Sequence, residues 1–158
     1  MPSLQKPLQI EVLPNFSVDN EKSVLFAKLF IMADEGIQAA TQDRVEDRLA
    51  KMDGETLFVA KDDDDQVMAM AGLKRMVDVP EGIVLNVATM PRYRRNGVGT
   101  AVMQKLIEVA GEEGLEYIHV HPGPGSGPFY ANLGFDHKLG KSFNPSWGSL
   151  ALVQHSDT

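Results

Sequence analysis

The spacing of apolar residues along the chain predicts an alternation of strands and helices. Leu8 to Leu13 largely alternates apolar and polar residues, as a half-buried strand does, and Pro14 ends this pattern. Further strands are predicted at 56–61, 66–73, 83–89 and 117–121, and two final ones around 135–139 and 149–155. Apolar residues at helical spacing predict helices over 20–36, 41–54, 98–114 and 129–133.

Only one of these connections requires two parallel strands. The unit from Ile83 to His121 is a strand, a helix and a strand, and a helical crossover of this kind joins parallel strands, whereas short turns suit antiparallel hairpins. No internal repeat or linker divides the chain, and 158 residues suit one domain. The pattern therefore predicts a single α/β domain over residues 1–158, built on a mixed sheet.

Composition and charge exclude several classes of protein. The chain has no cysteine, which removes disulfides, a thiol nucleophile and thiolate metal sites. Its formal net charge of −7 disfavours a general nucleic-acid binder, which needs a basic surface for the phosphates. No apolar run approaches the ~20 residues of a membrane span, and the first residues lack a signal-peptide pattern. We therefore expect a cytoplasmic protein with no nucleic-acid or membrane partner.

Four consecutive aspartates, Asp62 to Asp65, stand between two predicted strands. Such a run is compatible with a Ca²⁺ or Mg²⁺ site, or with a hairpin turn in which aspartate side chains bond the backbone. The glycine and distal glutamate of a calcium-binding loop are missing. The sequence favours the turn, and we expect no metal.

The segment Arg94 to Thr100 (RRNGVGT) lies between a strand and a helix and could bind a phosphate group. The first N–H groups of a helix have no internal partner, and Gly97 and Gly99 would let a phosphate approach the backbone. A dinucleotide-binding G-x-G-x-x-G fails because Val102 occupies the third glycine position. A phosphate-loop NTPase fails because the Gly-Lys-Ser/Thr ending is absent. A plain turn with a basic edge would explain the glycines equally well.

A second motif resolves this choice through a family resemblance. Arg94, Gly97 and Gly99 match the Q/R-x-x-G-x-G/A motif, and FYANLGF places Tyr130 and Gly134 at the usual spacing of a tyrosine-bearing helix. Together the motifs resemble the GNAT superfamily of N-acetyltransferases. The resemblance implies a mixed, mostly antiparallel sheet of about seven strands, splayed between parallel strands four and five, with about four flanking helices.

The resemblance also implies a site for acetyl-CoA and a direct attack of a primary amine on the thioester. Backbone groups of three residues would hold the pantetheine and the acetyl carbonyl: Val87, Ala88 and Thr89. Seven residues would cradle the pyrophosphate: Arg94, Arg95, Asn96, Gly97, Val98, Gly99 and Thr100. Tyr130 matches the tyrosine that serves as the acid for the departing thiolate, and its alternative role is packing beside Phe129.

The base that accepts the amine's proton is less defined. His119 and His121 should face the same side of their strand, and His121, at the strand end, is the candidate base because imidazole titrates near neutrality. Glu81 is a second candidate. Gly123 stands where many family members have asparagine, and HPGPGSGPFYANLGF resembles a subgroup with a histidine at this strand end. In that subgroup the tyrosine helix begins late, near Pro128.

Two other functions and several acceptors stay open at this level. A non-catalytic acyl-CoA-binding or regulatory module would keep the same pyrophosphate turn, and an acyltransferase could use a different acyl donor. The acceptor should contact the segments 29–52 and 144–147, which include Trp147, but the sequence does not identify it. Dimers are common in the family, so the resemblance allows a homodimer.

Overall fold

The structure, a computed structural model, describes residues 9–13, 26–29, 31, 41–52, 54–93, 97–120, 127–135 and 148–152. These residues form six strands, β1 (Ile10–Leu13), β2 (Thr56–Lys61), β3 (Val67–Arg75), β4 (Glu81–Thr89), β5 (Tyr117–Val120) and β6 (Gly148–Ala151). The helices are α2 (Gln42–Met52), α3 (Val98–Glu112), α4 (Gly127–Asn132) and the 3₁₀ turn η1 (Pro91–Tyr93). Residues 26–29 and 31 are also helical.

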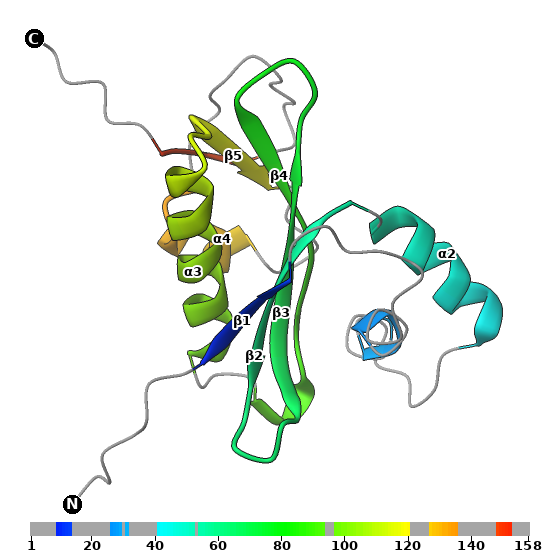
Figure 1. The fold of residues 1–158 in the computed structure, drawn as a ribbon. Coiled ribbons are helices and arrows are strands. Elements are labelled where there is room, and N and C mark those ends of the chain that lie inside the picture. Colours follow the sequence, from blue (N-terminus) through cyan, green and yellow to red (C-terminus); the bar gives the residue numbers. More distant parts are fainter. Residues whose placement is uncertain are drawn as a thin grey trace, which may run out of the picture.

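The six strands form one sheet in the order of the sequence, β1-β2-β3-β4-β5-β6 (Figure 1). Every neighbouring pair is antiparallel except β4 and β5, which are parallel. The parallel pair is the one whose connection contains the long helix α3, because a crossover of that length is needed to return the chain to the same end of the sheet. The mixed, mostly antiparallel sheet with one parallel pair confirms the predicted fold.

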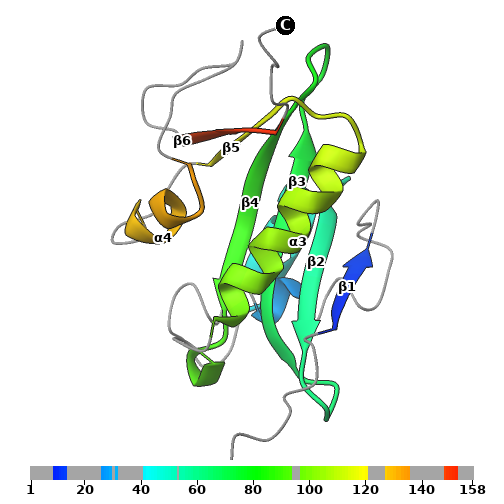
Figure 2. The same ribbon diagram turned by 90° about the vertical axis from the view of Figure 1, so that its left-hand side faces the viewer.

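Helices cover the two faces of the sheet (Figures 1 and 2). Helix α3 runs along one face, where alternate strand residues such as Phe58, Leu73 and Ile118 pack with Met103 and Leu106 of the helix. On the other face a second cluster joins residues of β2 and β3 to α2 and to the helical residues 26–29 and 31, and its members include Phe26, Leu49, Leu57, Val59 and Met70. The period-two alternation of the strands separates these two apolar layers.

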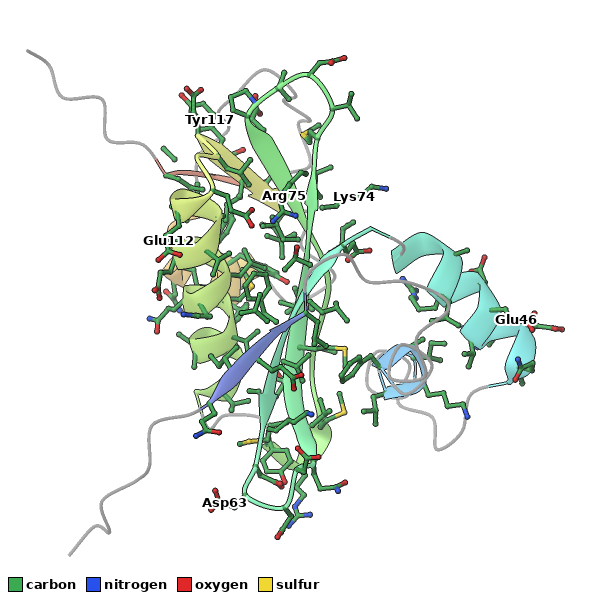
Figure 3. The ribbon with its side chains drawn as sticks, in the orientation of Figure 1. Glu46, Asp63, Lys74, Arg75, Glu112 and Tyr117 are labelled. Atoms are coloured by element: carbon green, nitrogen blue, oxygen red, sulfur yellow. The ribbon has the colours of Figure 1, made fainter. Side chains whose placement is uncertain are left out.

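One ion pair ties the far end of α3 to the sheet. Arg75, at the end of β3, lies on the face that α3 covers (Figure 3), and its guanidinium bonds the Glu113 carboxylate just after the helix. The same guanidinium donates to Thr56 Oγ1 at 3.0 Å. Gly114 follows with φ of 85°, the left-handed conformation that ends helices and that glycine adopts freely.

Element bounds agree closely with the periodicity. β2 and the first residue of α3 are as predicted, whereas β4 begins two residues earlier, at Glu81, and β3 runs on to Arg75. Helix α4 begins at Gly127, next to the predicted Pro128. Of the predicted strand around Phe135 to Leu139, only Phe135 is described, and it is not in a strand. No helix in the described ranges is long and apolar enough to span a membrane.

Candidate functional site

Strand β4 has two halves with different neighbours. Glu81 to Val84 pair with β5 on one side, opposite Tyr117 to Val120, and Gly82 to Val84 pair with the end of β3 on the other. From Leu85 to Thr89 the pairing to β3 continues, but in the part of the chain that the structure describes no strand pairs with these residues on the β5 side. The sheet therefore opens after Val84, and no described strand takes up the backbone N–H and C=O groups of Leu85 to Ala88 on that edge, an arrangement that suits an extended ligand.

The open half of β4 also contains a β-bulge. Met70 is opposite Ala88 and Gly72 is opposite Leu85, so one residue of β3 faces two residues of β4, Asn86 and Val87. A bulge bends its strand and turns the local backbone groups away from the regular ladder. The bulge falls at the first of the predicted pantetheine-binding residues, Val87 to Thr89.

Three elements meet at the start of α3. Gly97, the residue before the helix, has φ of 76° and ψ of 3° and makes no side-chain cap bond, so the first N–H groups of α3 have no capping side chain there. A Cβ added to Gly99 would lie 2.9 Å from Thr89 Oγ1 and 3.8 Å from the Phe129 ring. The absence of a side chain at Gly99 therefore lets the end of β4, the start of α3 and α4 come together.

This junction brings together most of the predicted cofactor residues that are described. Val87, Ala88 and Thr89 form the open end of β4, and Gly97 leads into the first turn of α3, which holds the remaining three: Val98, Gly99 and Thr100. Arg94, Arg95 and Asn96 lie outside the described residues. Phe129 was not predicted at this site, although it directly precedes Tyr130 in the motif, which is the signal that could have found it.

Tyr130 lies in α4 among aromatic side chains. Its ring meets those of Phe129 and Phe135 edge-on, with centroids 5.0 and 6.0 Å apart, and the residue is 7% exposed. Burial raises the pKa of the Tyr130 hydroxyl to about 12 because the apolar surroundings disfavour the phenolate. The hydroxyl therefore keeps its proton throughout the physiological range. His121, the predicted base, lies outside the described residues.

A buried polar trio joins β4, β5 and β6 on the face opposite α3. His119 Nε2 is 2.6 Å from Glu81 Oε1, and His119 Nδ1 is 2.7 Å from Ser149 Oγ. All three residues are at most 1% exposed. The strand neighbours of His119, Ile118 and Val120, belong to the core under α3, so His119 must point to the other face.

The trio has the connectivity of a serine, histidine and carboxylate triad, but its burial excludes nucleophilic catalysis. A serine nucleophile must reach the substrate carbonyl, and Ser149 is 1% exposed. Glu81, the second candidate base, is bonded to His119 and is equally buried. The arrangement thus links the closed half of β4 to its two neighbours. In the sequence, the contact of His119 with Glu81 and Ser149 is indicated only by the alternation of His119 with apolar residues.

Acidic side chains elsewhere do not form a metal centre. Within the described ranges, no group of three or more histidine, aspartate and glutamate side chains could hold a metal ion. The run Asp62 to Asp65 forms the predicted turn between β2 and β3, in which Asp62 Oδ1 accepts bonds from the N–H groups of Asp64 and Gln66.

Sequence comparison identifies the class of protein that this fold defines. The sequence model described as the acetyltransferase (GNAT) family matches residues 24–135, which is more than half of the chain, and the chain belongs to this family. The protein is therefore an acyltransferase of the acetyl-transferring type. A search of curated proteins found no match.

Solved structures agree on the fold. A protein from Exiguobacterium sp. 255-15, provisionally described as an acetyltransferase, is 26% identical with a TM-score of 0.61, and the match covers 92% of this chain and 94% of that one. The ribosomal-protein-S18-alanine N-acetyltransferase of Escherichia coli is 15% identical, with a TM-score of 0.65 and coverage of 96% and 97%. N-acetylglutamate synthase from Neisseria gonorrhoeae, solved with coenzyme A and N-acetylglutamate, is 15% identical, with a TM-score of 0.54 over 81% of this chain and 28% of that one.

Proposed function

We propose that the protein transfers the acetyl group of acetyl-CoA to a primary amine by direct attack in a ternary complex. The observation that carries this proposal is that, among the described residues, no strand pairs with Leu85 to Ala88 on the β5 side, next to the start of α3 at Gly99. An extended chain can bond this strand edge, and an anion can bond the helix start beside it. Membership of the family supports the same pair of ligand groups.

The residues present fit acetyl-CoA at both ends of this junction. A pantetheine arm carries amide groups that suit the edge of β4 at Val87 and Ala88, where no described strand pairs on the β5 side. A pyrophosphate suits the first turn of α3, where a Cβ at Gly99 would take up the space needed for close approach. Arg94 and Arg95 are expected to add charge there, since arginine bonds phosphate through two N–H groups.

The chemistry then divides among a few groups of the chain. The thioester supplies an activated acetyl group when acetyl-CoA is bound. We assign a backbone N–H in the open half of β4, at Val87 or Ala88, to bond the acetyl oxygen as negative charge develops on it. Tyr130 matches the tyrosine of the family motif, and we assign it to donate a proton to the departing thiolate. His121 is the residue we assign to accept the proton of the attacking amine.

Free-thiol release tests this function directly. The purified protein is incubated with acetyl-CoA and a panel of amines, and thiol release is followed with each. The panel includes a peptide whose N-terminal residue is alanine, and free glutamate as a separate amine. These choices follow the names of two structural neighbours, an alanine N-acetyltransferase and an N-acetylglutamate synthase. We expect release that depends on at least one amine. Binding of acetyl-CoA without turnover on any amine would instead indicate a non-catalytic acyl-CoA-binding module.

Substitution of Tyr130 tests the assigned acid. Because general acid catalysis contributes about 10²- to 10⁴-fold, Tyr130→Phe should lower kcat at least about 100-fold and leave the KM for acetyl-CoA nearly unchanged. Tyr117→Phe is the matched control, since Tyr117 lies at the start of β5, on the closed side of the sheet (Figure 3). Equal turnover of the Tyr130→Phe variant and the wild type would refute the assignment.

A further inference from the structure

The Tyr130 ring is held between two phenylalanine rings. The rings of Phe129 and Phe135 meet it edge-on, with interplanar angles of 74° and 81°. Such contacts fix the orientation of a ring, because the positive edge of one ring faces the negative face of the other. Among the described residues, none forms a hydrogen bond with the Tyr130 hydroxyl. In this part of the chain, the direction of the hydroxyl is therefore set by the packing of the rings.

Phe135 is on the fixed side of this arrangement. It is 4% exposed, and its backbone N–H donates to Tyr130 O at 3.0 Å. Its own carbonyl lies so close to β6 that a Cβ added to Gly148 would come within 2.2 Å of Phe135 O. Helix α4 accordingly lies beside β6 in Figure 2. Phe135 can therefore shift only if β6 shifts with it.

Phe129 is on the side of the junction between β4 and α3. The residue is half-buried, and two of its ring carbons lie 3.8 Å from a Cβ added to Gly99, in the first turn of α3. Thr89 Oγ1, at the end of β4, approaches the same position. The centroid of the Phe129 ring is also 5.0 Å from that of Tyr130. Phe129 therefore connects the junction assigned to acetyl-CoA with the ring of the assigned acid.

We propose that Phe129 is a positioning residue that holds the Tyr130 hydroxyl toward the departing thiolate of acetyl-CoA. This proposal rests on the proposed function, because it concerns the acid of the same site. In that step the C–S bond of the thioester breaks, its electron pair stays on sulfur, and the Tyr130 proton moves to the sulfur. The phenolate that remains then takes up a proton from water.

The position of the acid matters because proton transfer acts over a short distance. A general acid must lie within hydrogen-bond reach of the atom that it protonates, and a misplacement of about 1 Å can lower the rate about 100-fold. Without the ring of Phe129, the Tyr130 ring could turn toward the vacated space while Phe135 stays on β6. The hydroxyl would then point away from the sulfur for part of the time.

Phe129→Leu is the main test, because it removes the ring and keeps an apolar side chain. We expect kcat to fall about ten-fold, whereas the KM for acetyl-CoA and the Kd for coenzyme A, measured by calorimetry, stay within about two-fold. Phe129→Tyr keeps a ring and should hold kcat within about two-fold of the wild type. Phe58→Leu is the matched control, since it removes a ring of the same apolar cluster in β2. It should lower stability and leave kcat unchanged.

The Tyr130→Phe background separates positioning from folding. This background lacks the hydroxyl that Phe129 is proposed to direct, so adding Phe129→Leu should not lower kcat further. A structural role of Phe129 would instead lower kcat by the same factor in both backgrounds.

A titration of the ligand-free protein gives a readout that needs no turnover. Burial raises the pKa of Tyr130 from 10.0 to about 12, so a ring that turns toward water should titrate at a lower pH. At about pH 11, ultraviolet absorbance should therefore show more phenolate in Phe129→Leu than in the wild type. Phe58→Leu should show no such increase, and neither should Phe129→Leu in the Tyr130→Phe background.

Three results would contradict the proposal. If Phe129→Leu lowers kcat equally in both backgrounds, or adds no phenolate, Phe129 does not orient Tyr130. If it raises the Kd for coenzyme A and leaves kcat unchanged, the ring contacts the cofactor rather than directing the acid. In these cases the proposed function stands. If the wild type itself releases no thiol from acetyl-CoA with any amine, both the proposed function and the role of Phe129 are wrong.

Discussion

The two halves of β4 belong to one strand but are built in opposite ways. The closed half, Glu81 to Val84, is paired on both sides and is pinned by the buried contact of Glu81 with His119. The open half, Leu85 to Thr89, pairs with β3 and with no described strand on its other side, and it contains the bulge. In the closed half polar groups are satisfied within the protein, whereas in the open half no described strand covers the backbone groups on the β5 side.

This difference shows how a sheet can carry an opening without losing its order. An unpaired strand edge in the middle of a sheet has no partner to fix its position. Here the four residues before the opening are fixed by β3, by β5 and by the trio of Glu81, His119 and Ser149. The rigid half therefore holds the open half in place, and changes to the two halves should have different effects.

The largest effect is expected from His119→Ala in the closed half. Removing the imidazole leaves the Glu81 carboxylate buried without this partner, and breaking a buried pair costs about 3–5 kcal/mol of unfolding free energy. Urea denaturation measures this loss. Tyr117→Phe in the same strand serves as the control and should change the free energy by less than about 0.5 kcal/mol. A loss below about 1 kcal/mol for His119→Ala would show that the trio does not hold the closed half.

Gly72→Ala should destabilise the protein at the point where the closed half of β4 meets the open half. Gly72 pairs with Leu85, the first residue of the open half, and a Cβ there would lie 2.2 Å from Glu55 Oε1 and 3.0 Å from Leu85 O. Glu55 is fully buried and cannot swing into solvent, so we expect a loss of about 1–3 kcal/mol. Adding Glu55→Asp shortens the side chain by one methylene and moves the carboxylate away from residue 72. The double variant should therefore recover part of the unfolding free energy that Gly72→Ala loses. No recovery would mean that the Leu85 carbonyl is the group that clashes.

Gly99→Ala should affect ligand binding in the open half more than stability. The added Cβ would meet Thr89 Oγ1 at 2.9 Å, a close contact that offsets what alanine gains over glycine in a helix, so we expect a stability change below about 1 kcal/mol. Coenzyme A affinity should fall about ten-fold because the methyl group occupies the helix start. Gly111→Ala, with nothing within 4 Å of its Cβ, is the control and should stabilise α3 by about 0.5–1 kcal/mol. If Gly99→Ala and Gly111→Ala bind coenzyme A with equal affinity, the start of α3 is not the pyrophosphate site.

The smallest effect concerns pH and the Tyr93 hydroxyl, which donates a hydrogen bond to Asp62 in the turn between β2 and β3. This bond raises the pKa of Tyr93 above the usual 10.0, so the contribution of the hydroxyl to stability is complete below pH 10 and is lost as the pH rises through the raised value. The stability difference between the wild type and Tyr93→Phe should therefore be constant from pH 6 to 9 and shrink above pH 10. Urea denaturation at these pH values measures it. A difference that grows above pH 10 would contradict the assigned bond.

Local patterns predicted the elements of this fold more completely than its contacts. The alternation of apolar residues placed β2 and β3, and the glycines around α3 placed its ends, because both signals act over a few neighbouring residues. The family motifs then supplied the sheet order and the candidate residues Tyr130 and Gly99. In contrast, the pairing of His119 with Glu81 and Ser149 joins residues 38 and 30 positions apart. No local pattern specifies such a contact.

The bulge and the contact of Tyr93 with Asp62 were missed for the same reason. A bulge depends on how two strands come into register, and β4 shows no sequence break at Asn86. Tyr93 and Asp62 are 31 positions apart, and each has a sufficient local explanation, one as part of a turn before a helix and the other as part of a hairpin. Gly72 likewise reads as an ordinary strand glycine until the carboxylate of Glu55 is seen beside it.

The place of Ser149 in β6 has a consequence for how the chain is made. During synthesis β4 and β5 leave the ribosome well before β6, so the His119 ring can be bonded to Glu81 while its Nδ1 still faces water. Docking of β6 is the step that brings Ser149 to this nitrogen and encloses the ring. The parallel pair beside the opening is therefore enclosed only after residue 149 has left the ribosome, although both of its strands are made well before that.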